Sequence, residues 1–125
     1  MREPHFRGWR DRFGCHVDVV DTQGKARPLP NVVNHTRGRW EWDTARPRLN
    51  ELALSILAQA LGEDPSLADL RAGQLECVRL ADDFVWELLP LVRGNHWELC
   101  QKSVVQYVFG RNRTAAQVIP LFKTA

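Results

Sequence analysis

The stretch LNELALSILAQALG, residues 49–62, decides the fold. Its apolar side chains recur at spacings of three and four residues: Leu49, Leu52, Ala53, Ile56, Leu57, Ala60 and Leu61. This spacing places them on one stripe of an α-helix, which must be buried against another layer of structure. Gly62 is expected to end the helix, Pro47 to lie near its first turn and Thr44 to cap it.

A second amphipathic helix is predicted to run from about residue 75 to residue 90. Its core-facing stripe consists of apolar residues: Leu75, Val78, Ala81, Phe84, Val85, Leu88 and Leu89. Its outer face carries charged residues: Glu76, Arg79, Asp82, Asp83 and Glu87. Pro90 marks its approximate end, because proline cannot continue the helical hydrogen bonding. Two shorter helical segments are expected, one after Asp64 and one at about residues 104–109, where Gly110 stops it.

Residues 12–21 show the period of two that is typical of a half-buried strand. Phe13, Cys15, Val17 and Val19 alternate with polar residues there, which predicts that these four side chains point to the core. The segment 21–25 is expected to turn the chain into a short partner strand at residues 26–29. Pro28 and Pro30 confine that strand to an edge of the sheet or to a strand end.

Two more strands are predicted around tryptophans. Trp40 and Trp42 alternate with charged residues, so a third strand there would place both indoles on one face. Residues 97–99 are predicted as a brief further strand. The resulting fold class is α+β: a small antiparallel sheet of three to four strands packed against two main amphipathic helices plus a short C-terminal helix.

The length of 125 residues and the hydrophobic content of 44% fit a single domain, residues 1–125. Its core is expected at about residues 6–109. The tail, 110–125, carries an apolar patch that we expect to dock on the domain or on a partner: Val118, Ile119, Leu121 and Phe122.

The chain contains no apolar stretch long enough to span a membrane, and its polar N-terminus does not resemble a signal peptide. These features predict a cytoplasmic protein with no membrane partner. The three cysteines, Cys15, Cys77 and Cys100, have no paired spacing. They are therefore expected to be free thiols in a reducing compartment rather than a disulfide framework.

The net charge of +2 conceals a strong segregation of charge along the chain. Residues 1–48 contain ten Lys or Arg against six Asp or Glu, whereas residues 49–109 contain four against nine. The last sixteen residues contain three basic residues and no acidic one. Such a distribution is typical of surfaces that select charged partners.

Motifs that would indicate catalysis or metal binding are weak. His96 with Cys100 and Cys15 with His16 are the nearest approach to metal-ligand pairs, but adjacent strand residues point to opposite faces. Asp82, Asp83 and Glu87 resemble paired carboxylates, and a solvated helix face explains them equally. Ser103 has no nucleophile motif around it, and no glycine-rich phosphate loop is present. No enzyme, catalytic residue, metal or cofactor is predicted.

The candidate binding residues fall in two clusters of opposite charge. Arg37, Arg39, Arg46 and Arg48 surround Trp40 and Trp42, which is the composition of a surface that contacts phosphates and stacks on bases. The alternative is that both tryptophans belong to the core and only the arginines are exposed. The acidic cluster, Asp82, Asp83 and Glu87, either meets a basic groove of a protein or simply solubilises the helix.

The order of several of these residues resembles a family of small uncharacterised prokaryotic proteins, a domain of unknown function often carried by phages and plasmids. The resemblance covers about residues 6–109 and rests on Pro28, Leu29, Trp40, Trp42, Leu52, Ala53, Leu54, Ile56, Leu57, Gly62, Asp83, Phe84, Leu88, Leu89, Pro90, Trp97 and Leu99. Similar proteins usually have a glycine-rich stretch where this chain has residues 43–47.

The resemblance implies a non-enzymatic accessory protein of a mobile genetic element. Such a protein would bind a protein complex of the host and would act, for example, as an inhibitor of a defence system such as CRISPR. The alternative function is direct binding of nucleic acid through the basic segment 37–48.

Overall fold

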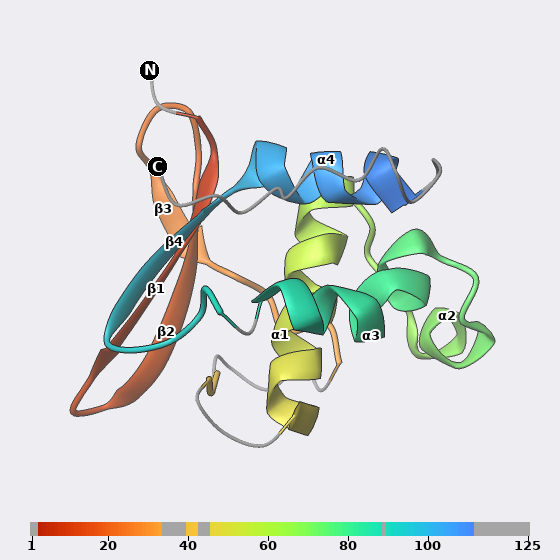
Figure 1. The fold of residues 1–125 in the computed structure, drawn as a ribbon, viewed down its shortest axis with the longest axis horizontal. Coiled ribbons are helices and arrows are strands. Elements are labelled where there is room, and N and C mark those ends of the chain that lie inside the picture. Colours follow the sequence, from red (N-terminus) through yellow and green to blue (C-terminus); the bar gives the residue numbers. More distant parts are fainter. Residues whose placement is uncertain (1–2, 34–39, 43–45, 89, 112–125) are drawn as a thin grey trace.

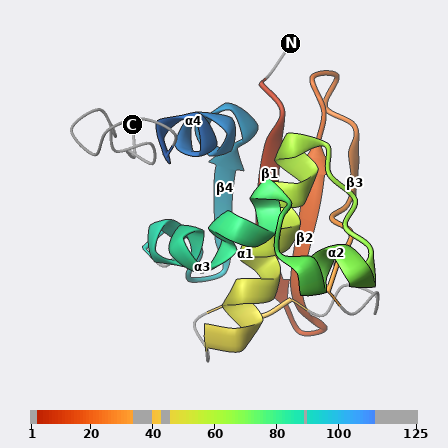
Figure 2. The ribbon, with the colours of Figure 1, turned by 90° about the vertical axis from the view of Figure 1, so that its right-hand side faces the viewer.

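The computed structural model of the chain describes residues 3–33, 40–42, 46–88 and 90–111. Within these ranges, four antiparallel strands form one sheet in the order β3-β2-β1-β4, and four helices pack with it. The helices lie on one side of the sheet, and the other side of the sheet is not covered by any of them (Figures 1 and 2). The predicted α+β class, with a small antiparallel sheet against amphipathic helices, is confirmed.

The centre of the sheet is a hairpin of two strands, β1 (His5–Asp11) and β2 (Gly14–Val20). The short strand β3 (Ala26–Pro28) pairs with β2 and lies at one edge, as its prolines predicted. The strand β4 (His96–Cys100) pairs with β1 at the other edge and confirms the brief strand predicted at residues 97–99.

Two predictions about the strands are wrong. The strand predicted at Trp40 and Trp42 does not form over the described residues there, where Trp40 makes an isolated bridge with Cys15. The sheet instead contains β1, which the sequence did not predict. Phe13 does not point to the core: it is 77% exposed in the turn between β1 and β2. Its backbone N–H donates a 2.7 Å hydrogen bond to the Asp11 carboxylate, so the chain turns before Phe13 reaches an inward position.

The helix α1 (Arg46–Leu61) is the central helix, and its predicted apolar stripe is buried from Leu49 to Leu57, while Ala60 and Leu61 are half-buried. Gly62 follows it with a φ of 68°, in the left-handed region, and thus ends the helix as predicted. Pro47 lies in the first turn, while Thr44, the expected cap, lies outside the described residues.

The other helices are α2 (Leu67–Ala72), α3 (Glu76–Leu88) and α4 (Gln101–Arg111). Ser66 caps α2 through a reciprocal pair of hydrogen bonds with Asp69. The helix α4 follows β4 directly, so it begins earlier than the predicted segment 104–109, and it extends past Gly110 to Arg111. The predicted apolar patch of the tail lies outside the described residues.

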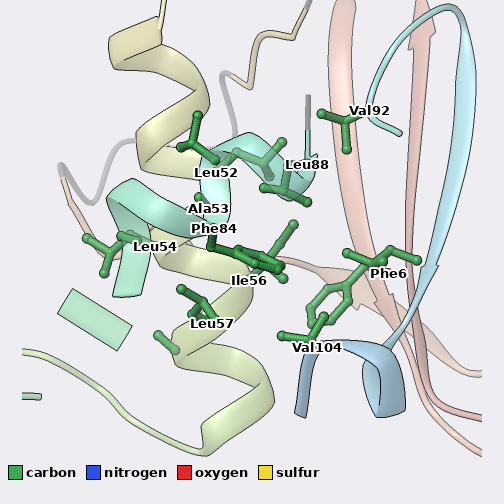
Figure 3. Close-up of a cluster of buried hydrophobic side chains, with 14 of the residues drawn as sticks. Phe6, Leu52, Ala53, Leu54, Ile56, Leu57, Phe84, Leu88, Val92 and Val104 are labelled. Carbon is green, nitrogen blue, oxygen red and sulfur yellow. The ribbon is translucent and has the colours of Figure 1, made fainter. Parts of the chain in front are cut away.

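The core forms where the inner face of the sheet meets α1, α3 and α4. Figure 3 shows Phe6 extending from β1 towards Ile56 of α1, Phe84 of α3 and Val104 of α4. All four side chains are fully buried. Each aromatic or branched residue buried in this way typically contributes about 1.5–3 kcal/mol to the free energy of unfolding.

Candidate partner-binding surface

The outer face of α3 carries the acidic residues singled out from the sequence. Asp82 and Asp83 are exposed and Glu87 is half-buried, while the opposite side of the helix is buried in the core. Trp86 lies on the same outer face and is 57% exposed. We refer to Asp82, Asp83, Trp86 and Glu87 as the acidic face of α3. Trp86 was not predicted as a binding residue, although its position outside the apolar stripe of the helix indicates an exposed side chain.

The acidic residues of α3 outnumber its basic residue. In α3, Arg79 is the basic residue, and it forms an ion pair one turn away with Glu76. Asp82 accepts a 3.2 Å hydrogen bond from the amide of Asn50, which is a neutral donor. The helix therefore has four acidic residues against one basic residue, with an exposed indole among three of the carboxylates.

The structure describes the two tryptophans of the basic segment, but the side chains of its four arginines lie outside the described residues. Arg37 and Arg39 lie outside the described residues, and Arg46 and Arg48 belong to the first turns of α1. Trp40 and Trp42 are 3% and 1% exposed, which confirms the interpretation that both are core residues. Their indoles are consequently not accessible for stacking on bases.

The start of α1 lies beside α3. The hydrogen bond from Asn50 to Asp82 joins two positions that are 32 residues apart in the chain. The backbone of Arg46, in the first turn of α1, is one helical turn before Asn50.

Trp42 is held in place by four contacts. Its Nε1 donates a 2.8 Å hydrogen bond to the carbonyl oxygen of Gly94, and the Arg10 guanidinium lies 5.5 Å from the centroid of its ring. Arg10 also donates to the Trp42 carbonyl oxygen at 3.2 Å. Edge-to-face packing against Trp97, with ring centroids 5.5 Å apart, completes the site. These contacts indicate a structural role for Trp42.

A second polar cluster, which the sequence analysis missed, lies on the side of the sheet away from the helices. Arg7 pairs with Asp18 across β1 and β2 at 3.3 Å, and Trp9 stacks on His16 with centroids 5.0 Å apart. The Nε2 of His16 is 3.0 Å from the Asp11 carboxylate. Each of these side chains pairs with or stacks on another member of the cluster, so the cluster stabilises the hairpin.

The pKa of Asp11 is lowered from its ordinary value. The largest cause is the hydrogen bond with His16, and the bond from the Phe13 N–H adds to it. These hydrogen bonds therefore favour the ionised carboxylate over the protonated acid.

The buried thiol of Cys77 is unsuited to nucleophilic chemistry. Burial and the neighbouring Glu63 carboxylate raise its pKa from 9.0 to about 12. The thiol therefore stays protonated at neutral pH, and the thiolate is the form that reacts. Glu63 also accepts a 2.9 Å hydrogen bond from the backbone N–H of Cys77. Cys77 thus packs as a small apolar residue at the start of α3.

The residue pairs weighed as metal ligands do not meet in the structure. His96 and Cys100 are the two ends of the strand β4, and four strand residues span about 13 Å. Cys15 and His16 are adjacent in β2 and therefore point to opposite faces. Within the described ranges, no three His, Cys, Asp or Glu side chains are grouped as metal ligands.

Comparison of the chain with protein-family models, with curated proteins and with solved structures found no match. Among the described helices, none combines the length and the hydropathy needed to cross a membrane.

Proposed function

We propose that this chain is a non-enzymatic binding protein whose acidic face of α3 docks on a basic surface of a protein partner. The observation that carries the proposal is the exposed indole of Trp86 next to Asp82, Asp83 and Glu87. Tryptophan is enriched among the residues that dominate binding energy at protein interfaces. Surrounding carboxylates speed the encounter with a basic partner and disfavour acidic ones.

The resemblance to proteins of phages and plasmids supports a host complex as the partner. A complex that binds nucleic acid presents basic grooves. An acidic helix face competes for such a groove because it carries negative charge, as the nucleic acid does. An inhibitor of a defence system such as CRISPR, acting in the cytoplasm, would work in this way. Neither a catalytic residue nor a cofactor is part of this proposal.

The proposal is tested by affinity capture from host lysate with the tagged full chain. The informative variants are Trp86→Ala and the triple variant Asp82→Asn, Asp83→Asn, Glu87→Gln. Their matched control is Glu3→Gln with Asp64→Asn, because both of these carboxylates lie outside α3. We expect the wild type and the control to retain one discrete partner. Trp86→Ala should bind that partner at least about tenfold more weakly.

Equal retention of that partner by all variants would show that the acidic face of α3 is not the binding surface. Direct binding of nucleic acid through the segment 37–48 is the alternative. It predicts that the purified chain binds a generic duplex or single strand, with an affinity that falls steeply as salt is added. Substitution of Trp86 would leave such binding unchanged.

A further inference from the structure

A pocket of about 400 Å³ lies where the end of the sheet meets α1 and α4. Its lining comes from segments that are distant in the sequence: Pro4, Val19, Val20, Asp21, Thr22, Lys25, Arg27, Gln59 and Gln101. Gln59 belongs to the last turn of α1, and Gln101 is the first residue of α4. None of these residues belongs to the acidic face of α3.

The pocket contains two cations that are not neutralised by neighbouring carboxylates. Lys25 and Arg27 both line it, and within the part of the chain that the structure describes neither forms an ion pair. The one acidic side chain in the lining, Asp21, is bound to backbone groups. Its Oδ1 accepts hydrogen bonds of 2.9 Å from the N–H groups of Gln23 and Lys25.

The turn that carries Lys25 is fixed before any ligand arrives. The Asp21 N–H donates to the Lys25 carbonyl, and the Gly24 N–H donates to the Asp21 carbonyl, each at 3.0 Å. Gly24 has a φ of 82°, which glycine adopts without strain. Arg27 is held by the pairing of β3 with β2, opposite Val19. A binding site whose backbone is already ordered loses less entropy when it binds.

The donors of the pocket match a phosphoryl group better than a carboxylate. Arg27 offers a planar fork of N–H donors, Lys25 a point charge, and Gln59, Gln101 and Thr22 further donors. A phosphate monoester has three terminal oxygens that can accept from these groups, whereas a carboxylate has two. The volume exceeds what the phosphoryl group alone would fill, and Pro4, Val19 and Val20 supply an apolar wall for an attached organic group.

We propose that this pocket binds a small phosphate monoester, with Arg27 and Lys25 holding the phosphoryl group. The proposal is independent of the acidic face of α3, since the two sites share no residue. A failure of one proposal therefore leaves the other standing.

The test is a titration of the isotopically labelled full chain with phenyl phosphate, followed through the backbone amide signals. We expect saturable shifts at residues 19–27 and at Gln59 and Gln101, and a weaker version of the same pattern with inorganic phosphate. Benzyl alcohol, which has a ring but no charge, should produce none of these shifts. Arg27→Gln and Lys25→Gln should each weaken the binding of phenyl phosphate at least about tenfold.

The matched control is Arg93→Gln, which removes an exposed cation from the loop before β4. Its affinity for phenyl phosphate should equal that of the wild type. Arg27 and Lys25 are exposed, so both variants are expected to keep the dispersed spectrum of the folded chain. Absence of saturable shifts, equal binding by the Arg27→Gln and Lys25→Gln variants, or equal shifts with benzyl alcohol would each overturn the proposal.

Discussion

The indole ring of Trp97 lies directly against the backbone of Gly8, its paired residue on the neighbouring strand β1. A Cβ atom at Gly8 would overlap the Cε2, Nε1 and Cζ2 atoms of that ring. Trp97 is buried, and its ring also packs edge-to-face on Trp42. The absence of a side chain at Gly8 is therefore a packing requirement at the centre of the sheet.

Gly8→Ala is expected to lower the free energy of unfolding by about 2–3 kcal/mol, because the indole must move within a filled core. Urea denaturation of the two proteins measures the difference. Gly110→Ala is the matched control, since a Cβ atom at this position of α4 would meet open space among the described residues. That control should change stability by less than about 1 kcal/mol. Equal stability of Gly8→Ala and wild type would contradict the packing argument.

Trp42→Phe should destabilise the protein by about 1–2 kcal/mol. Phenylalanine keeps an aromatic ring beneath Arg10 but leaves the Gly94 carbonyl without the 2.8 Å hydrogen bond. Thermal and urea unfolding monitored by circular dichroism provide the measurement. Trp86→Phe is the control, because substitution of this exposed indole should change stability by less than about 0.5 kcal/mol. Equal losses in the two variants would argue against a structural role that is specific to Trp42.

Cys77 should make the protein less stable as the pH rises from 9 towards 12. The thiol of the unfolded chain ionises near its ordinary pKa of 9.0, while the folded thiol, with a pKa of about 12, keeps its proton. The unfolded state then binds fewer protons, so stability falls by up to about 1.4 kcal/mol per pH unit in this window. Urea denaturation at several pH values measures the slope.

Cys77→Ala should remove that contribution to the slope. All other ionisable groups are common to both proteins, so their contributions cancel in the difference between them. Parallel stability profiles for wild type and variant across pH 9 to 11 would show that the buried thiol is not linked to folding.

Caesium ions should quench the fluorescence of Trp86 more strongly than iodide does. The indole is 57% exposed beside Asp82, Asp83 and Glu87, so a cation is concentrated near it and an anion is repelled. The signal of Trp86 is obtained by subtracting the spectrum of Trp86→Phe. The preference should shrink with added salt, since the charges are exposed.

The triple variant Asp82→Asn, Asp83→Asn, Glu87→Gln should lose the preference for caesium while Trp86 stays accessible. A preference that persists in this variant would mean that the field at Trp86 comes from other charges.

The helices were predictable because their information is local. In α1, residues Leu52 to Leu57 show the helical period, and Gly62 terminates the helix at the predicted position. The acidic residues of α3 could be assigned to an outer face for the same reason. The strand β1 was missed because its inward positions are Phe6, Gly8 and Arg10, so only one of them gives an apolar signal.

The candidate sites were predictable only in part. The residues Asp82, Asp83 and Glu87 could be identified from the sequence, but the exposure of Trp86 depends on how α3 packs against α1 and the rest of the core. For Trp40 and Trp42 the sequence left two interpretations open, a stacking surface and the core, and the structure confirms the core. The pocket at Arg27 is lined by segments that are far apart in the sequence, so no local sequence pattern predicts it.

The sequence by itself determined the α+β class, the two amphipathic helices and the edge position of β3, because periodicity and proline chemistry act over a few residues. The tertiary structure decided that β1 is a central strand, that Trp97 covers Gly8, and that the start of α1 lies beside α3. These relationships depend on pairings between residues far apart in the chain, whose energies arise only when the whole core assembles.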